Sequence, residues 1–195
     1  MCIRDRSTKS LRKIDTDMLA VGVRSAKLEE GGVLAELDEA LGGRLAKAIE
    51  VEAFTAAEGQ GLRLSGADGI AAKTLVVFGL GKKATADEPR MLAMRAVQAA
   101  KAHASVAVVL PESSAETVRR AAEGALSGGY KYAVYKTGDR KPKHHVSSVE
   151  IVVSSRTKAY EAAIAEARIV QEAIALARDL VNAPPNDMHP VALET

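Results

Sequence analysis

Short apolar runs alternate with segments of helical periodicity along most of this chain. Four mainly apolar runs of five or six residues predict strands that are buried on both faces. These runs lie at 18–23, 73–78, 105–110 and 149–153. Between them, apolar residues three and four positions apart predict helices, at 33–41, 87–102 and 113–127. Strands that alternate with helices predict an α/β fold with a mixed, largely parallel sheet flanked by helices.

Polar residues and glycines mark the ends of several of these helices. Asp87 is a candidate N-cap, and Ser113 with Glu116 has the spacing of a capping box, in which each side chain satisfies a free backbone N–H group. The two glycines at 128–129 predict the end of the third helix. The segment 50–66 is typical of a hairpin or an edge strand.

The longest helical segment, 158–181, follows the last predicted strand. At about 1.5 Å per residue it would be roughly 36 Å long, and the two prolines after Ala183 prevent its continuation. An apolar stripe at three- and four-residue spacing predicts one face that packs against a partner. The stripe consists of Tyr160, Ala163, Ala167, Val170, Ile174, Ala177 and Val181.

These patterns divide the chain into four segments. Residues 1–10 have no pattern that packing explains, so we expect a disordered leader or sequence foreign to the natural protein. Residues 11–155 are predicted to form one α/β domain, and residues 156–181 a connecting helix. The ten residues after position 185 are too few for a domain, so 182–195 is expected to be the start of another one.

Composition narrows the classes of protein that this chain can represent. The 195 residues include 27 basic and 25 acidic side chains, and a net charge of +2 gives no support for a polyanionic partner. The single cysteine, Cys2, excludes an internal disulfide and a cysteine-based zinc cluster. No apolar run approaches the roughly 18 residues needed to span a bilayer, and the charged start is unlike a secretory signal. We therefore expect a cytoplasmic protein with no membrane partner.

The glycine-rich segment 79–82, Gly-Leu-Gly-Lys, follows the most apolar of the predicted strands. Backbone N–H groups in such a turn can bind a phosphate, and Lys82 would add a positive charge. The segment is neither a Walker loop nor a complete G-x-G-x-x-G motif. A structural turn is therefore favoured over an anion site.

The segment 131–145 is locally basic. One tyrosine directly precedes it and two lie within it. Contact with phosphates is one interpretation, and Tyr130, Tyr132 and Tyr135 would then be candidates for stacking on bases. The favoured interpretation is a solvated excursion, with Tyr130 and Tyr132 packed under the sheet. The basic side chains of the segment are Lys131, Lys136, Arg140, Lys141, Lys143, His144 and His145.

The remaining polar residues form no recognisable active site. His144 and His145 are adjacent, so on a strand they would point to opposite faces and could not easily share a metal. His103 and His189 are isolated, and Ser113 and Ser114 are explained by helix capping. From these residues we assign no catalytic, cofactor-binding or metal-binding residue.

Three segments together resemble the leucyl aminopeptidase (cytosol aminopeptidase) family. Residues 74–82 resemble that family's strand ending in G-x-G-K, and residues 123–136 resemble its E-G-x-x-L-x-x-Y-x-F-x-x-Y-K stretch. The end of the long helix resembles its A-R-x-L-x-N-x-P-x-N motif with a proline four residues later. The matching positions there are Ala177, Arg178, Leu180, Asn182, Pro184, Asn186 and Pro190.

The resemblance implies an N-terminal α/β domain similar to macro domains, a connecting helix and a C-terminal peptidase domain. Family members hold two divalent metal ions, manganese or zinc, release N-terminal amino acids from peptides, and usually form hexamers. The K-G-x-x-x-D-x-G-G and N-T-D-A-E-G-R strings of the catalytic domain do not occur in this sequence. No catalytic or metal-binding role can therefore be transferred to a residue of this chain.

The leading hypothesis is that the chain is the non-catalytic N-terminal part of such an aminopeptidase, truncated before the catalytic domain and inactive alone. This part would serve scaffolding and assembly, and no metal ion is expected to bind to it. Two alternatives stay open. The first is a stand-alone macro-like module that binds a nucleotide or an ADP-ribose-like ligand through residues 79–82. The second is a DNA-contacting domain that uses residues 131–145, although nucleic acid is the disfavoured partner.

Overall fold

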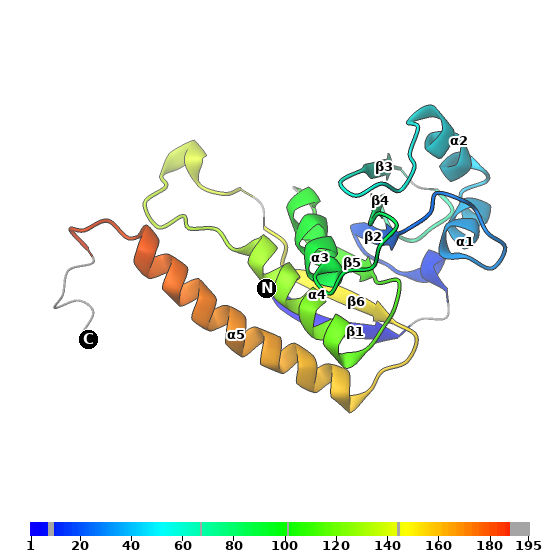
Figure 1. Ribbon diagram of the computed structural model, residues 1–195. Coiled ribbons are helices and arrows are strands. Elements are labelled where there is room, and N and C mark those ends of the chain that lie inside the picture. Colours follow the sequence, from blue (N-terminus) through cyan, green and yellow to red (C-terminus); the bar gives the residue numbers. More distant parts are fainter. Residues whose placement is uncertain (8–9, 67, 101, 144, 188–195) are drawn as a thin grey trace.

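The computed structural model of the chain describes residues 1–7, 10–66, 68–100, 102–143 and 145–187. Its centre is a six-stranded sheet with the order β1-β6-β5-β2-β4-β3 (Figure 1). All neighbouring strands are parallel except β3, which runs antiparallel to β4 at one edge. The predicted mixed, largely parallel sheet is therefore confirmed. The strands are β1 (Cys2–Ser7), β2 (Met18–Val23), β3 (Gly61–Ser65), β4 (Thr74–Gly79), β5 (Ser105–Val109) and β6 (Ser148–Val153).

Helices cover both faces of this sheet, and each face has its own apolar core. On one face α3 (Glu88–Ala99), α4 (Ala115–Gly129) and the start of α5 (Lys158–Asn182) pack over the sheet. On the other face lie α1 (Val33–Ala40), α2 (Arg44–Val51) and the 3₁₀ turn η1 (Leu11–Lys13). Because both faces are covered, all six residues of β2 and of β4 are buried.

The expectation of a disordered leader at residues 1–10 is wrong, because β1 begins at Cys2 and pairs along β6. Its side chains alternate as an edge strand requires. Ile3 and Asp5 are buried, and Arg4 on the opposite face donates to the Glu150 carboxylate at 2.8 Å. The Asp5 carboxylate forms an ion pair with Arg156, which lies just before α5, with 3.2 Å between Asp5 Oδ2 and Arg156 Nε. The sheet therefore starts before residue 11.

Three other details differ from the sequence-based predictions. Helix α2 was not expected, and of the two interpretations of 50–66 only the edge strand, β3, is confirmed. The N-cap of α4 is Ser114 rather than Ser113, and its capping box is completed by Thr117 rather than Glu116. Asp87 caps no N–H group with its side chain but pairs with Arg90 and Arg120.

A second 3₁₀ turn, η2 (Gly138–Arg140), lies in the segment between α4 and β6. Within the described residues, no helix combines the length and the apolarity needed to cross a membrane.

Candidate functional site

Two of the segments that carry the family resemblance meet at Tyr130, the residue that directly follows α4. The Tyr130 hydroxyl donates to the Asp179 carboxylate at 2.6 Å, and Asn182 Nδ2 lies 3.4 Å from the same hydroxyl. The Arg178 guanidinium lies over the Tyr130 ring, 3.9 Å from its centroid, which is the geometry of a cation–π contact. The end of α4 is therefore joined to the last turns of α5, although the contacting residues are about 50 positions apart in the sequence.

Tyr135 makes a second connection a few residues later. Its hydroxyl donates to the carboxylate of Asp187, in the turn that follows α5, and its ring lies 6.0 Å from that of Tyr132. The bond to Asp187 raises the pKa of Tyr135 well above its usual range, and loss of hydration together with the bond to Asp179 raises that of Tyr130. Both hydroxyls therefore stay protonated and act as donors at neutral pH.

The expectation that Tyr130 and Tyr132 pack under the sheet is wrong. Helix α4 continues to Gly129 and carries the following residues along the flank of α5, where Tyr130 and Tyr132 are half-buried and Tyr135 is exposed. In Figure 1 the segment after α4 extends toward the distal, orange to red end of α5. The hydrophobic pattern of the sequence did not indicate the contacts of Tyr130 with Arg178 and Asp179.

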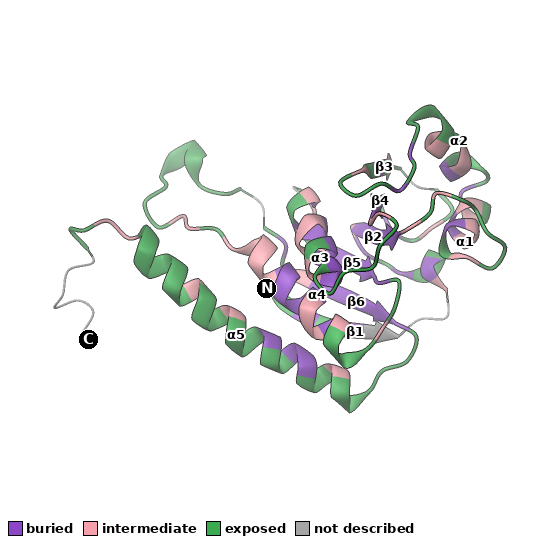
Figure 2. Cartoon of the chain, viewed as in Figure 1, coloured by how far each residue is buried: buried purple, intermediate pink, exposed green. Residues whose placement is uncertain are grey.

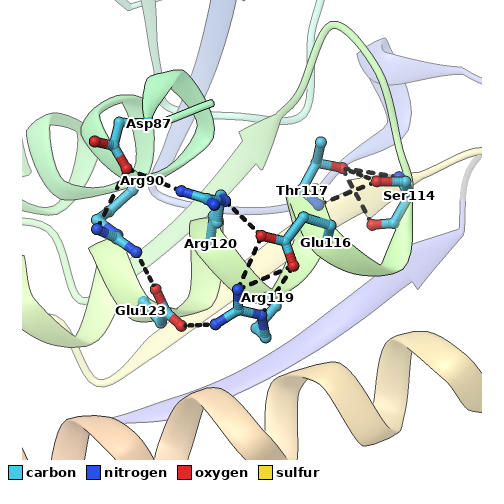
Figure 3. A network of polar contacts seen from close by, with 8 residues as sticks. All are labelled: Asp87, Arg90, Ser114, Glu116, Thr117, Arg119, Arg120 and Glu123. Atoms are coloured by element: carbon cyan, nitrogen blue, oxygen red, sulfur yellow. Dashed lines mark hydrogen bonds and ion pairs between the residues drawn. The ribbon is translucent and has the colours of Figure 1, made fainter. Parts of the chain in front are cut away.

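An ionic network fixes α4, and with it Tyr130, against α3. Glu123 is the centre of this network, and its side chain is only 4% exposed. It accepts from Arg90 of α3 at 2.6 Å and from Arg119 one turn earlier on α4. Figure 3 shows the continuation of the network through Glu116, Arg120 and Asp87. Sequence reasoning identified Glu123 only as part of the resemblance, because Arg90 lies 33 residues away.

Close backbone contact between the same two helices explains why the residue after Glu123 is a glycine. A Cβ atom at Gly124 would lie 2.0 Å from the Arg90 carbonyl oxygen, a distance that no side chain tolerates. Glycine at this position therefore lets α3 and α4 approach closely. The Glu-Gly pair of the resembling segment thus has a packing role in this chain.

The packing of α5 changes along its length, as Figure 2 shows. Ala163, Ile164 and Ala167 are buried on the domain, whereas Val170 and Ile174 of the predicted stripe are about two-fifths exposed and Val181 is 84% exposed. A second apolar face, which sequence reasoning missed, lies on the side of the helix opposite the buried residues and is solvent-exposed. Its residues Ile169 and Leu176 are 70% and 61% exposed. The residues of this second face are Ala162, Ala165, Ile169, Ala173, Leu176 and Leu180. Their own three- and four-residue spacing was the signal that could have identified it.

A cavity of about 220 Å³ separates part of α5 from the end of α4. Leu126 and Tyr130 line it from the α4 side, and Ile174 and Arg178 from α5. The Ser127 hydroxyl bridges the two helices beside the cavity by donating to Gln171 at 2.7 Å. The two helices therefore leave an open space between these side chains.

The turn at Gly79–Lys82 is structural rather than an anion site in this fold. The N–H groups of residues 79, 80 and 81 donate to the carbonyl oxygens of Gln60, Val23 and Ala56, at 3.0, 2.9 and 3.0 Å. These three donors are therefore not available to a phosphate. Glycine is needed at 79 because a Cβ atom there would lie 2.2 Å from the Ala57 carbonyl oxygen, and at 81 because φ is +74°.

A second cavity, of about 330 Å³, lies at the carboxyl ends of β5 and β6, where open α/β sheets commonly bind ligands. Among its described lining residues Glu36 is the only charged one. Its carboxylate accepts hydrogen bonds from the Ser10 hydroxyl and the Leu11 N–H, both at 2.9 Å. A carboxylate disfavours a phosphate-bearing ligand, so this cavity does not support the nucleotide-binding alternative.

The basic segment 131–145 is exposed wherever the structure describes it, except at Tyr132 and Ala133, which are half-buried. Lys143 pairs with Asp139 at 2.9 Å, and Lys136, Arg140 and Lys141 are exposed. Apart from its first residues, which reach Asp187 through Tyr135, the segment is the solvated excursion that the sequence predicted.

The histidines do not gather into a site among the residues that the structure describes. His144 and His189 lie outside these residues, and His145 is exposed. His103 lies with its Nε2 2.9 Å from the Arg63 guanidinium, and burial beside that cation lowers the pKa of His103. In the described ranges no group of three or more His, Cys, Asp or Glu side chains is placed to hold a metal ion. These residues therefore do not fit the two divalent ions that the family resemblance implies.

Comparison with known sequences agrees with the three resembling segments. A family model described as the N-terminal domain of the cytosol aminopeptidase family matches residues 20–139. The probable cytosol aminopeptidase of Streptomyces griseus is 35% identical over 207 residues, which cover 94% of this chain and 40% of that protein. The one from Caulobacter vibrioides is 34% identical and is covered over 37% of its length. The chain thus spans about two-fifths of the length of these relatives.

Solved structures show the same relationship. A mutant of tomato leucine aminopeptidase superposes with a TM-score of 0.84 at 25% sequence identity, over 99% of this chain and 40% of that one. The bottromycin maturation enzyme BotP in complex with Mn superposes with a TM-score of 0.67 at 27% identity, over 91% of this chain and 34% of BotP.

Proposed function

This chain belongs to the cytosol aminopeptidase family, and we propose that it acts as the non-catalytic N-terminal region of an aminopeptidase that releases N-terminal amino acids from peptides. One observation carries the proposal: the similarity extends over 94% of this chain but only 40% of the Streptomyces griseus relative. The matching family model is that of the N-terminal domain. Peptide hydrolysis would then belong to the part of the relatives that this chain does not match.

Within such an enzyme the chain would serve as a scaffold and a connector. The α/β domain has two closed cores, and α5 leaves it from one face with only its first turns buried. The exposed second face of α5 would be covered by the peptidase region, because an apolar stripe of that length is unusual on a free surface. The contacts at Tyr130 and Tyr135 would fix where the connector leaves the domain.

Two divalent metal ions, manganese or zinc, would act in the unmatched region rather than in this chain. Such ions activate a water molecule and stabilise the charge that develops on the attacked peptide carbonyl. The described residues provide no cluster that would hold them. Manganese is present in the complex of the related BotP.

The proposal also covers the oligomeric state and the cellular location of the whole enzyme, which would be those of the family. The whole enzyme would be a homo-oligomer, a hexamer as the resemblance implies, and would work in the cytoplasm. The names of the relatives, which are cytosol aminopeptidases, support the location.

An activity assay tests the proposed division of labour. We expect the purified chain to show no turnover of leucine p-nitroanilide with added manganese or zinc. A chimera in which this chain replaces the matching 40% of the Streptomyces griseus relative should show metal-dependent turnover, with the unaltered relative as the positive control. Metal-dependent turnover that co-purifies with the isolated chain would contradict the proposal.

Nucleic-acid contact is the second candidate function, and the exposed cations Lys136, Arg140 and Lys141 favour it. If the segment binds phosphates, duplex DNA should bind to the chain with an affinity that falls steeply with salt. Replacing these three residues with glutamine should then abolish binding. An unchanged electrophoretic mobility of DNA at low salt would exclude this function for the chain.

A further inference from the structure

The two halves of α5 are held by different kinds of contact. In the proximal half, Ala163, Ile164 and Ala167 are buried against the domain core. We define the distal half as residues 169–182; none of its side chains is buried. A helix of this length is marginal in water without tertiary contacts. The distal half therefore needs another source of order.

Packing against α4 leaves no side chain of the distal half buried. The cavity of about 220 Å³ lies between the two helices, and Leu126 of α4 and Ile174 of α5 both line it. At the beginning of the distal half there is one polar bridge, between Ser127 and Gln171. Two turns further on, Arg178 and Asp179 contact Tyr130.

We propose that residues 130–135 form a strap that holds the distal half of α5, and the turn after it, in a fixed position relative to the sheet. Tyr130 binds three residues in the last turns of the helix, through its ring and its hydroxyl; they are Arg178, Asp179 and Asn182. Tyr135 binds Asp187 beyond the helix end. The strap thus crosses from the helix to the turn that leads out of it.

The strap is itself rigidly attached to the domain. Tyr130 directly follows α4, which is fixed to α3 by the Glu123 ion pairs and by the close backbone approach at Gly124. Asn182 also donates its side-chain amide to the Arg178 carbonyl at 2.7 Å, a further contact within the last turn of the helix. The order of the sheet domain is therefore transmitted through α4 and Tyr130 to the far end of α5.

This role is one of positioning, and its consequence for an enzyme rests on the function proposed above. If a peptidase region follows α5, the strap sets the direction in which the chain enters it. Most of the exposed second face of α5 points away from the strap, since Ile169 and Leu176 lie on the opposite side of the helix from Gln171 and Arg178. The strap and a covering partner could therefore act on the helix together.

Hydrogen exchange on the full 195-residue chain tests the strap directly. In Tyr130→Ala we expect amides in 169–182 to exchange about tenfold faster or more, because local opening of the distal half becomes easier. Amides in the proximal half and in β4 should keep their protection. The matched control is Tyr160→Phe, which also removes a tyrosine hydroxyl bond of α5, to the Ser113 carbonyl at 3.2 Å, but in the proximal half. It should leave exchange in 169–182 unchanged.

Milder variants protect the test against a folding defect. Tyr130→Phe keeps the ring and loses only the hydroxyl, and Asp179→Asn changes the same bond from the helix side. Each should speed exchange in 169–182 by a smaller factor than Tyr130→Ala while β4 stays protected. Unchanged exchange in 169–182 for all three folded variants would overturn the proposal. That result would leave the family assignment and the chimera assay untouched, so the two proposals can fail separately.

Discussion

At the scale of single residues, Asp17 joins three strands at their amino ends. Its carboxylate accepts from the N–H groups of Ala104 and Ser105, at 2.9 and 3.1 Å, just where β5 begins. It also accepts from Lys73 next to β4, at 2.6 Å. The bond to Lys73 and those to the two backbone groups hold the pKa of Asp17 well below its usual range. The ionised carboxylate therefore contributes to the stability of the sheet.

We expect Asp17→Asn to lower the free energy of unfolding by about 1 kcal/mol at neutral pH, since the amide accepts these bonds less strongly. Because the folded-state pKa lies below the unfolded value of about 4, this contribution is present above that pH and is lost as the pH falls toward the folded pKa. Urea unfolding should thus show a difference between wild type and variant that shrinks between about pH 7 and about pH 3.

The control for this prediction is Asp139→Asn. Asp139 also pairs with a lysine, but its side chain is 97% exposed. This variant should match the wild type at both pH values. A difference between Asp17→Asn and wild type that stays constant with pH would show that the carboxylate of Asp17 is not ionised selectively in the folded state.

At the scale of elements, the interface of α3 with α4 depends on one buried acid. Replacing Glu123 with alanine leaves Arg90 and Arg119 without their shared acceptor. We therefore expect the free energy of unfolding to fall by about 1–3 kcal/mol. Both arginines stay partly hydrated, which keeps this loss below that for a fully buried pair. Glu116→Ala removes an acid of the same network that is half-exposed and should have a much smaller effect in thermal or urea unfolding. Equal effects would mean that burial of Glu123 does not matter.

Most elements could be predicted because their pattern is local. The runs that became β2, β4, β5 and β6 are mainly apolar, and burial on both faces of a sheet suits such runs. Helix α2 was missed because it follows α1 after three residues and buries only Leu45. The strap was missed because Tyr130 and Asp179 are 49 residues apart, and their meeting depends on where α4 ends. Contacts of this kind are set by the assembled fold rather than by local pattern.

At the scale of the whole molecule, the first strand defines one edge of the sheet. Three consecutive charged residues, at positions 4–6, concealed it in the sequence, and only Ile3 among its described side chains is a buried apolar group. Its partner β6 would become the edge without it, and the Arg156 side chain would lose the buried Asp5. The core of the domain on that face would be partly uncovered.

We therefore expect a chain that starts at Leu11 to unfold cooperatively but with a free energy of unfolding lower by about 2 kcal/mol, the approximate value of burying one isoleucine side chain. Urea unfolding followed by circular dichroism measures this loss. A chain carrying Ile3→Ser in the complete sequence loses the same apolar burial and should show a shift of similar size in the same direction. Identical midpoints for the shortened and complete chains would show that β1 adds nothing to the sheet.

The pairing of β1 with β6 has a consequence for how the protein is made. Cys2 lies beside Ser148 in the sheet, so β1 pairs with a strand that is synthesised some 146 residues later. Because β6 also lies between β1 and β5, β1 has no place in the sheet until β6 has been added. Pairing across such sequence distance is slow, and the nascent chain must keep its first strand unpaired while the centre of the sheet forms. Although β1 is synthesised before the other five strands of this sheet, it is thus the last to dock, and the sheet is completed only after β6 has been translated.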